Sequence, residues 1–140
     1  EVDPATMMVE IKKYIVVHDC GVVINPMILA GQIQGGVAQG IGNAFYEQLV
    51  FDENGQLLNA SFMDYLLPTA DTVPNIETDH IVTPSPLNPL GIKGAGEAGA
   101  IPVGPLFAQA VEDALSLYNL EILEIPLSPN RLFELVHGTK

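Results

Sequence analysis

The chain has few positive charges. Its 140 residues include 5 lysines and arginines against 17 aspartates and glutamates, which gives a formal net charge of −12. Proteins that bind nucleic acid cluster lysine and arginine against the phosphates, so this composition excludes that class. No apolar run approaches the roughly 18 residues that a membrane-spanning helix requires, so we expect no membrane span.

Cysteine is also scarce. Cys20 is the only one, so the chain cannot form an internal disulfide or hold an iron–sulfur cluster by itself. The three histidines show no zinc-like spacing. His18 and Cys20 would share one face of a strand and could in principle bind a metal, but a strand end with a buried thiol is the favoured interpretation. We therefore predict no metal ligands among the side chains.

Apolar residues, in contrast, make up 48% of the chain and charged residues only 16%. This balance favours one domain, or a piece of one, that buries surface against something else. The pattern of apolar residues and turn signals predicts an α+β fold. The expected elements are strands over 9–17, 76–83 and 120–125, a hairpin over 49–59 that turns at Asn54-Gly55, and helices over 27–48, 102–119 and 128–136. The first helix is expected to start after Asn25-Pro26 and the last at Ser128-Pro129. In the second helix, the residues that recur at core spacing are Phe107, Ala110, Val111, Ala114 and Leu117.

The first predicted helix is unusual because it contains five glycines. Each costs about 0.5–1 kcal/mol relative to alanine, so close packing of the bare backbone must compensate. Gly31, Gly35 and Gly42 share one side by helical spacing, with Gln32 and Gln39 nearby. Such a face suits a neighbouring helix or a flat polar ligand, and spacing alone favours the helix.

The most informative stretch is 91–99, which we call the glycine segment. It places one carboxylate, Glu97, among glycines just before a helical pattern. A carboxylate there is either a charge at the start of a helix or a positioned base. Gly94, Gly96 and Gly99 also match G-x-G-x-x-G, but a dinucleotide site needs a strand that runs into the motif. A proline-rich loop precedes it here, so a nucleotide-binding module is the weakest interpretation.

Four blocks of sequence, 19–26, 31–42, 61–65 and 84–99, follow one another at consistent spacing. Together they resemble the C-terminal part of the molybdenum-binding large subunit of the xanthine oxidase family, which includes aldehyde oxidase and carbon monoxide dehydrogenase. The resemblance implies that residues 1–140 are the C-terminal segment of a molybdopterin-binding domain. It also implies a molybdenum hydroxylase that oxidises aldehydes, purines, N-heterocycles or carbon monoxide, with water as the oxygen source.

The resemblance assigns roles to individual residues as well. It implies that Glu97 is the catalytic base. No protein side chain would hold the metal, because the family's pterin does. The residues expected to bind the cofactor are Gln32, Lys93, Gly94, Ala95 and Gly96.

Further partners follow from the same resemblance. The expected cofactor is molybdenum–molybdopterin, in its cytosine dinucleotide form if the source is bacterial, with iron–sulfur clusters and FAD on partner domains or subunits. The expected partners are the rest of the molybdenum subunit, an iron–sulfur subunit, an FAD subunit and a small-molecule substrate. We expect a cytoplasmic location. The chain alone is expected to lack cofactor and activity and to self-associate. The alternative is a non-catalytic assembly or interaction domain with remnant motifs.

Overall fold

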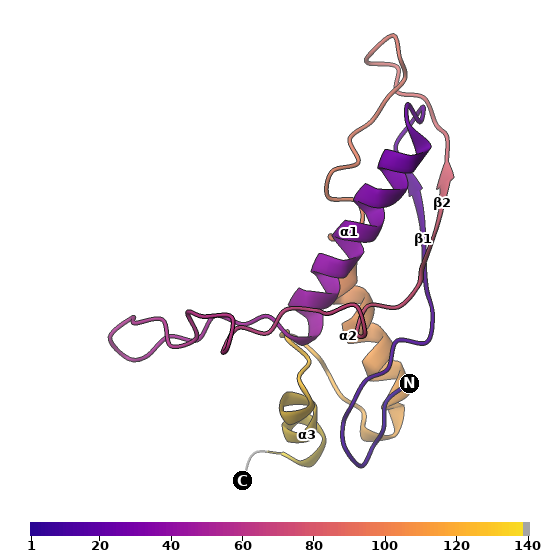
Figure 1. Cartoon of the computed structure of the whole chain (residues 1–140). Coiled ribbons are helices and arrows are strands. Elements are labelled where there is room, and N and C mark those ends of the chain that lie inside the picture. Colours follow the sequence, from indigo (N-terminus) through magenta and orange to yellow (C-terminus); the bar gives the residue numbers. More distant parts are fainter. Residues whose placement is uncertain (139–140) are drawn as a thin grey trace.

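Over the part of the chain that the structure describes, the fold combines three α-helices with a two-stranded sheet and confirms the α+β class (Figure 1). The computed structural model describes residues 1–138. In chain order the elements are β1 (Tyr14–Asp19), α1 (Pro26–Phe45), β2 (Ile76–Ile81), α2 (Val103–Ala114), a 3₁₀ turn (Ser116–Tyr118) and α3 (Pro129–His137). Among the described residues, none of these helices is both long and apolar enough to cross a membrane.

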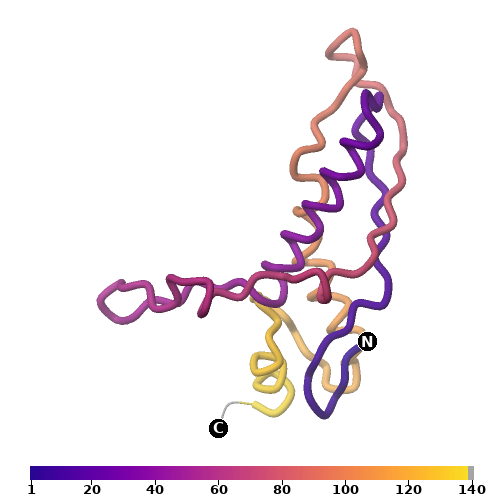
Figure 2. Tube along the Cα trace, in the orientation of Figure 1, coloured from indigo at the N-terminus to yellow at the C-terminus, as the bar shows by residue number. Residues whose placement is uncertain are grey.

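The sheet is parallel, with Tyr14 of β1 opposite Ile76 of β2 and Asp19 opposite Ile81. Parallel strands need a long crossover, and α1 provides part of it by running alongside both strands (Figures 1 and 2). Tyr14 and Val16 are buried, whereas Val17 is 57% exposed. The side chains therefore alternate, and one face of the sheet contributes to the core while the other stays open.

The core lies where α1, α2 and the strands meet. Phe107 of α2 packs against Phe45 of α1, with ring centroids 4.8 Å apart, and against Tyr14, at 5.8 Å. Leu132 of α3 is completely buried in the same cluster. The C-terminal helix is thereby joined to the body of the fold through one apolar contact surface.

Glycines allow α1 to approach its neighbours closely. A Cβ on Gly40 would lie 2.5 Å from the Cβ of Val103, and one on Gly36 would lie 3.0 Å from the Cα of Gly99. The prediction that close packing offsets the cost of the glycines is confirmed at these two positions. Gly31 and Gly35 have nothing within 4 Å of such a Cβ, so the favoured interpretation, in which a neighbouring helix packs on their face, is wrong for the described residues, and the alternative of a flat polar ligand stays open.

The segment between α1 and β2 projects away from the body as an arm (Figures 1 and 2). The expected turn is present, since the amide of Gly55 donates to the carbonyl oxygen of Asp52 at 3.0 Å and Gly55 has φ +80°. The pairing around it is short, with one antiparallel bridge between Phe51 and Leu57. The predicted hairpin is thus confirmed as a turn with minimal strand structure.

Two predicted strands need correction. The strand expected over 120–125 does not form. Instead, the amide of Ile122 donates to the Glu112 carboxylate at 2.6 Å, and the Ile122 side chain is buried against the core. The first strand was predicted to begin at Val9 but begins at Tyr14, because Val9 is bridged to Val2 instead.

The helix predicted over 102–119 ends at Ala114. The chain then makes a 3₁₀ turn that Asn119 closes in the left-handed conformation, with φ 51°. As a result Leu117, predicted to be in the core, is 97% exposed, and Leu115 is buried instead. Ala110 and Ala114 are exposed as well, so part of the predicted core face was wrong.

Candidate functional site

The glycine segment lies across α1 and touches it at two points. The side-chain amide of Gln32 donates to the carbonyl oxygen of Gly96 at 2.7 Å. Gly99 sits directly against the helix backbone, where a Cβ would overlap the carbonyl oxygen of Ile33. The structure thus brings together the two glycine-rich parts of the sequence, and Gln32 is the side chain that joins them.

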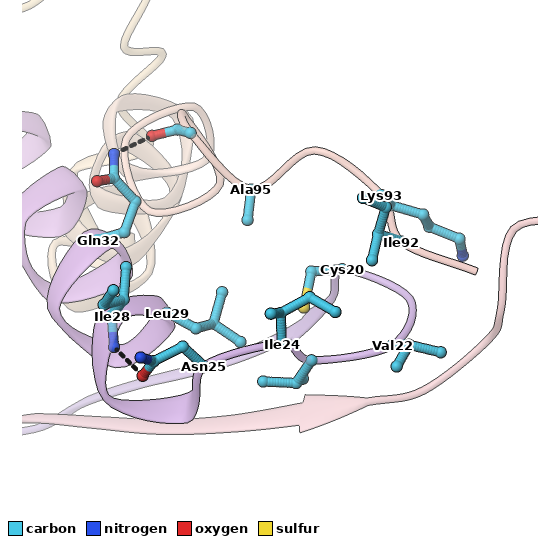
Figure 3. A pocket seen from close by; sticks show the side chains of 12 residues that line it. Cys20, Val22, Ile24, Asn25, Ile28, Leu29, Gln32, Ile92, Lys93 and Ala95 are labelled. Carbon is cyan, nitrogen blue, oxygen red and sulfur yellow. Dashed lines mark hydrogen bonds between the residues drawn. The ribbon is translucent and has the colours of Figure 1, made fainter. Parts of the chain in front are cut away.

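One side of this junction is an apolar pocket of about 390 Å³ (Figure 3). Its walls come from residues 20–29 at the start of α1 and from Ile92 to Gly96. Asn25 lies at its edge, and its Oδ1 accepts a hydrogen bond from the amide of Ile28 at 3.2 Å, which caps α1. Among the residues predicted to bind the cofactor, Gln32, Lys93, Ala95 and Gly96 line this pocket.

On the other side lies a second pocket of about 380 Å³, which we call the polar pocket. Gln39 and Asn43 of α1 line it together with Glu97. Gln32 and Gly96 line both pockets, so their hydrogen bond lies at the boundary. Glu97 and three side-chain amides therefore share one region of the surface.

Two polar side chains of the polar pocket, those of Gln39 and Asn43, were not predicted to belong to the site. Gln39 stood out only by its spacing from Gln32, and Asn43 was missed. Continuing the helical spacing by one turn from Gln39 would have reached Asn43. Gly31 and Gly35 open onto this pocket, whereas Gly42, predicted to lie on the same face, packs against Glu47 and Pro68.

Glu97 is exposed on a turn ahead of α2. Its backbone carbonyl oxygen accepts hydrogen bonds from the amides of Ala100, at 3.0 Å, and Ile101, at 3.2 Å. α2 begins only at Val103 and has no acidic residue in its first turn. The interpretation of Glu97 as a helix-start charge thus loses its geometric basis, and the residue lines the polar pocket instead.

Lys93 lines the apolar pocket, but its ammonium group is bonded elsewhere. Nζ donates to Oδ2 of Asp19 at 2.9 Å and to Oγ1 of Thr83 at 3.0 Å, and in Figure 3 the side chain runs away from Gln32. The Lys93 hydrogen bond, followed by that from the Gly21 amide, lowers the pKa of Asp19 to about 2. Asp19 was not predicted as a site residue, although it opens the first of the four sequence blocks.

Gly94, also predicted to bind the cofactor, lies in the open part of the glycine segment, with nothing within 4 Å of a Cβ built there. Across residues 1–138, no three histidine, cysteine, aspartate or glutamate side chains gather in a group that could hold a metal ion.

Comparison with known proteins shows close relatives along the whole chain. A family model described as a molybdopterin cofactor-binding domain matches residues 1–74. The nicotine 6-hydroxylase large subunit of Paenarthrobacter nicotinovorans is 45% identical over 138 residues, covering 99% of this chain and 17% of that protein. The carbon monoxide dehydrogenase large chain of Hydrogenophaga pseudoflava is 41% identical over 134 residues, covering 96% of this chain and 17% of that protein.

Solved structures show the same similarity. Quinoline 2-oxidoreductase from Pseudomonas putida 86 superposes with a TM-score of 0.94 at 42% identity, covering 99% of this chain and 18% of that one. The chain therefore spans less than a fifth of the length of these relatives.

Proposed function

Since this chain belongs to the molybdopterin cofactor-binding domain family, we propose that it forms part of the catalytic large subunit of a molybdenum hydroxylase. In this proposal it supplies one wall of the cofactor site and the catalytic base. The observation that carries the proposal is the polar pocket, where Glu97 lies with three side-chain amides and with the bare backbone of Gly31 and Gly35.

The residues of the polar pocket fit a flat, hydrogen-bonding ring system. The side-chain amides of Gln32, Gln39 and Asn43 each offer both donors and acceptors. The open glycines leave room for a ring to approach the helix backbone. No lysine or arginine of the described residues lines this pocket, which favours the uncharged pterin ring over a phosphate group. We propose that Gln32 and the backbone of residues 94–96 hold the pterin, with Lys93 beside them.

Glu97 supplies the proton-transfer chemistry in this proposal. The bound molybdenum cofactor would provide the oxidising centre for hydroxylation of a small-molecule substrate, with water as the oxygen source. Glu97 brings a carboxyl group to the polar pocket, and carboxyl groups are among the side chains that act as general bases. One of its oxygens can then accept a proton during the reaction, a contribution of roughly 10²–10⁴-fold in rate. The rest of the subunit would cover the exposed side of this pocket and exclude water.

Partner subunits are part of the proposal. The relatives are named as a large subunit, a large chain and a subunit gamma, so each belongs to a multi-subunit protein. We infer that the remainder of the molybdenum subunit, an iron–sulfur subunit and an FAD subunit assemble with this chain. The cytosine dinucleotide form of the cofactor belongs to the same inference.

The test replaces Glu97 with glutamine in the assembled protein. Glu97→Gln keeps the size of the side chain but removes its capacity to take a proton, so turnover falls by about 10²–10⁴-fold while molybdenum content stays unchanged. Glu53→Gln at the exposed tip of the arm is the matched control and leaves turnover intact. Turnover above half of the parent value in Glu97→Gln would refute the role of base. An assembled protein without molybdenum or pterin would establish the non-catalytic alternative.

A further inference from the structure

The start of the glycine segment is bonded to the end of β1 through side chains. Asp19, the last residue of β1, holds the Lys93 ammonium through Oδ2 at 2.9 Å, and the same ammonium donates to Oγ1 of Thr83 at 3.0 Å. Oδ1 of Asp19 accepts from the amides of Gly21, at 2.8 Å, and Thr83, at 3.2 Å. One carboxylate thus joins the end of β1, the chain after β2 and the glycine segment.

This ion pair is better shielded from solvent than others on the molecule. The side chains of Lys93 and Asp19 are 36% and 30% exposed. Those of Lys13 and Glu77, which pair at 3.3 Å across the start of the same sheet, are 61% and 54% exposed. Solvent and salt weaken exposed pairs most, so the Asp19–Lys93 pair constrains its surroundings more than the Lys13–Glu77 pair does.

The backbone reinforces the same junction. The amide of Lys93 donates to the carbonyl oxygen of Cys20 at 2.8 Å, and that of Val22 donates to the carbonyl oxygen of Gly91 at 3.0 Å. Between them Gly21 has φ +68°, and a Cβ there would overlap the Gly91 carbonyl oxygen. The chain therefore enters the glycine segment in one defined position and direction.

Between Lys93 and Gly99, the segment is held by the Gln32 bond to Gly96 and by a turn, in which the amide of Ala98 donates to the carbonyl oxygen of Ala95 at 3.4 Å and the carbonyl oxygen of Glu97 accepts from Ala100 and Ile101. Gly94 and Gly96 have nothing within 4 Å of a Cβ, and glycine is the most conformationally free residue. Among the described residues, the Gln32 bond to Gly96 is the one side-chain hydrogen bond to this stretch. The orientation of Glu97 consequently depends on how firmly Lys93 is held.

We propose that Asp19 and Lys93 are positioning residues, whose ion pair orients the glycine segment and so places the Glu97 carboxylate at the polar pocket. This inference rests on the proposed role of Glu97 as the base. Lys93 acts through the segment, since its ammonium is already bonded to Asp19 and Thr83. A displacement of roughly 1 Å at a reacting group can cost about 10²-fold in rate, so a loosened segment has a measurable effect.

The experiment compares lysine variants in the assembled protein. Lys93→Met removes the charge and keeps the aliphatic stem, Lys93→Arg keeps the charge, and Lys13→Met removes the other, exposed ion pair. We expect Lys93→Met to speed amide hydrogen exchange over residues 92–99 by roughly tenfold and to lower kcat by roughly tenfold or more. KM and molybdenum content stay within about twofold of the parent. Lys93→Arg restores at least half of kcat, and Lys13→Met changes neither measurement.

Asp19→Asn supplies an independent test of the same pair. Asp19→Asn should also speed exchange over 92–99 and lower kcat. The double variant with Lys93→Met should differ from Lys93→Met by less than about twofold in both measurements, because the two substitutions break the same ion pair. If Lys93→Met fails to assemble, Asp19→Asn and Lys93→Arg decide by the same two measurements. If the amide hydrogen-exchange rate over 92–99 in Asp19→Asn or Lys93→Met equals that of the parent protein, the proposal is overturned. The proposal is also overturned if these variants exchange faster over 92–99 but keep the parental kcat, while Glu97→Gln abolishes turnover. Full turnover in Glu97→Gln refutes the proposed base instead, and the exchange rates then still show whether the pair holds the segment.

Discussion

The packing of α1 on α2 provides a sharp test through Gly40→Ala. Gly40 is buried in α1, and an added Cβ would lie 2.5 Å from both Cβ and Cγ2 of Val103. Val103 is completely buried and is the first residue of α2, so its side chain cannot move into solvent. Alanine at position 40 must therefore push the start of α2, and the turn that carries Glu97, away from α1.

Two opposing terms set the magnitude. Alanine is favoured over glycine in a helix by about 0.5–1 kcal/mol, whereas overpacking a filled core costs about 1–3 kcal/mol. Gly40→Ala should thus destabilise the helix pair by about 0.5–2 kcal/mol net. Gly35→Ala is the matched control on the same helix, because a Cβ there meets nothing within 4 Å. Gly35→Ala has only the benefit of alanine's higher helix propensity, so it should stabilise α1 by about 0.5–1 kcal/mol.

Amide hydrogen exchange of α1 and α2 measures the free energy of local opening and so reports the change in stability caused by each variant. It is measured in the assembled protein without cofactor. Since about 1.4 kcal/mol corresponds to tenfold, exchange should be roughly 2–30-fold faster in Gly40→Ala and about 2–5-fold slower in Gly35→Ala. Removing the cofactor keeps ligand binding at the polar pocket out of the comparison. If both variants slow exchange equally, α2 does not begin against Gly40 and the described packing is wrong.

Two further outcomes follow from the site. The pKa of Asp19 is lowered to about 2 by the Lys93 hydrogen bond, so its stabilising contribution is complete above the ordinary carboxyl pKa and disappears as the pH falls through about 2. Asp19→Asn should therefore have a lower thermal midpoint than the parent by circular dichroism at pH 6, and this difference should shrink as the pH is lowered towards 2 and vanish below it. A difference that stays constant with pH would contradict this. Gln32→Ala loses the 2.7 Å bond to Gly96, worth about 0.5–1.5 kcal/mol, and should lower pterin content or turnover while helix content by circular dichroism stays constant. Unchanged pterin content and rate would mean that Gln32 only joins the helix to the segment.

Local signals in the sequence determined where several elements begin. Asn25 followed by proline predicted the start of α1, and the Asn25 side chain caps it. Ser128, also followed by proline, accepts from the amide of Arg131 at 3.2 Å and starts α3. The Asn54-Gly55 turn formed where it was predicted. These features depend on hydrogen bonds among residues close in the chain, so their residue types are sufficient to predict them.

The strand predicted over 120–125 shows the limit of such patterns. Its residues suit a strand, but a strand also needs a partner strand, and Ile122 bonds to Glu112 instead. Helical spacing grouped Gly31 with Gly42, yet Gly31 is open, whereas Gly36 and Gly40 pack against residues 99–103. The period of a helix defines its faces without saying which face a neighbour will cover.

The site itself depended on contacts between distant parts of the chain. The resemblance of four sequence blocks to a known family pointed to Glu97 and Gln32, and helical spacing placed Gln39 near Gln32. Only the tertiary structure placed Gln32 against Gly96, 64 residues later, and Lys93 against Asp19, 74 residues earlier. Such pairs form because α1, the parallel strands and the glycine segment pack into one arrangement, and that arrangement depends on the shape of the whole core rather than on any local run of residues.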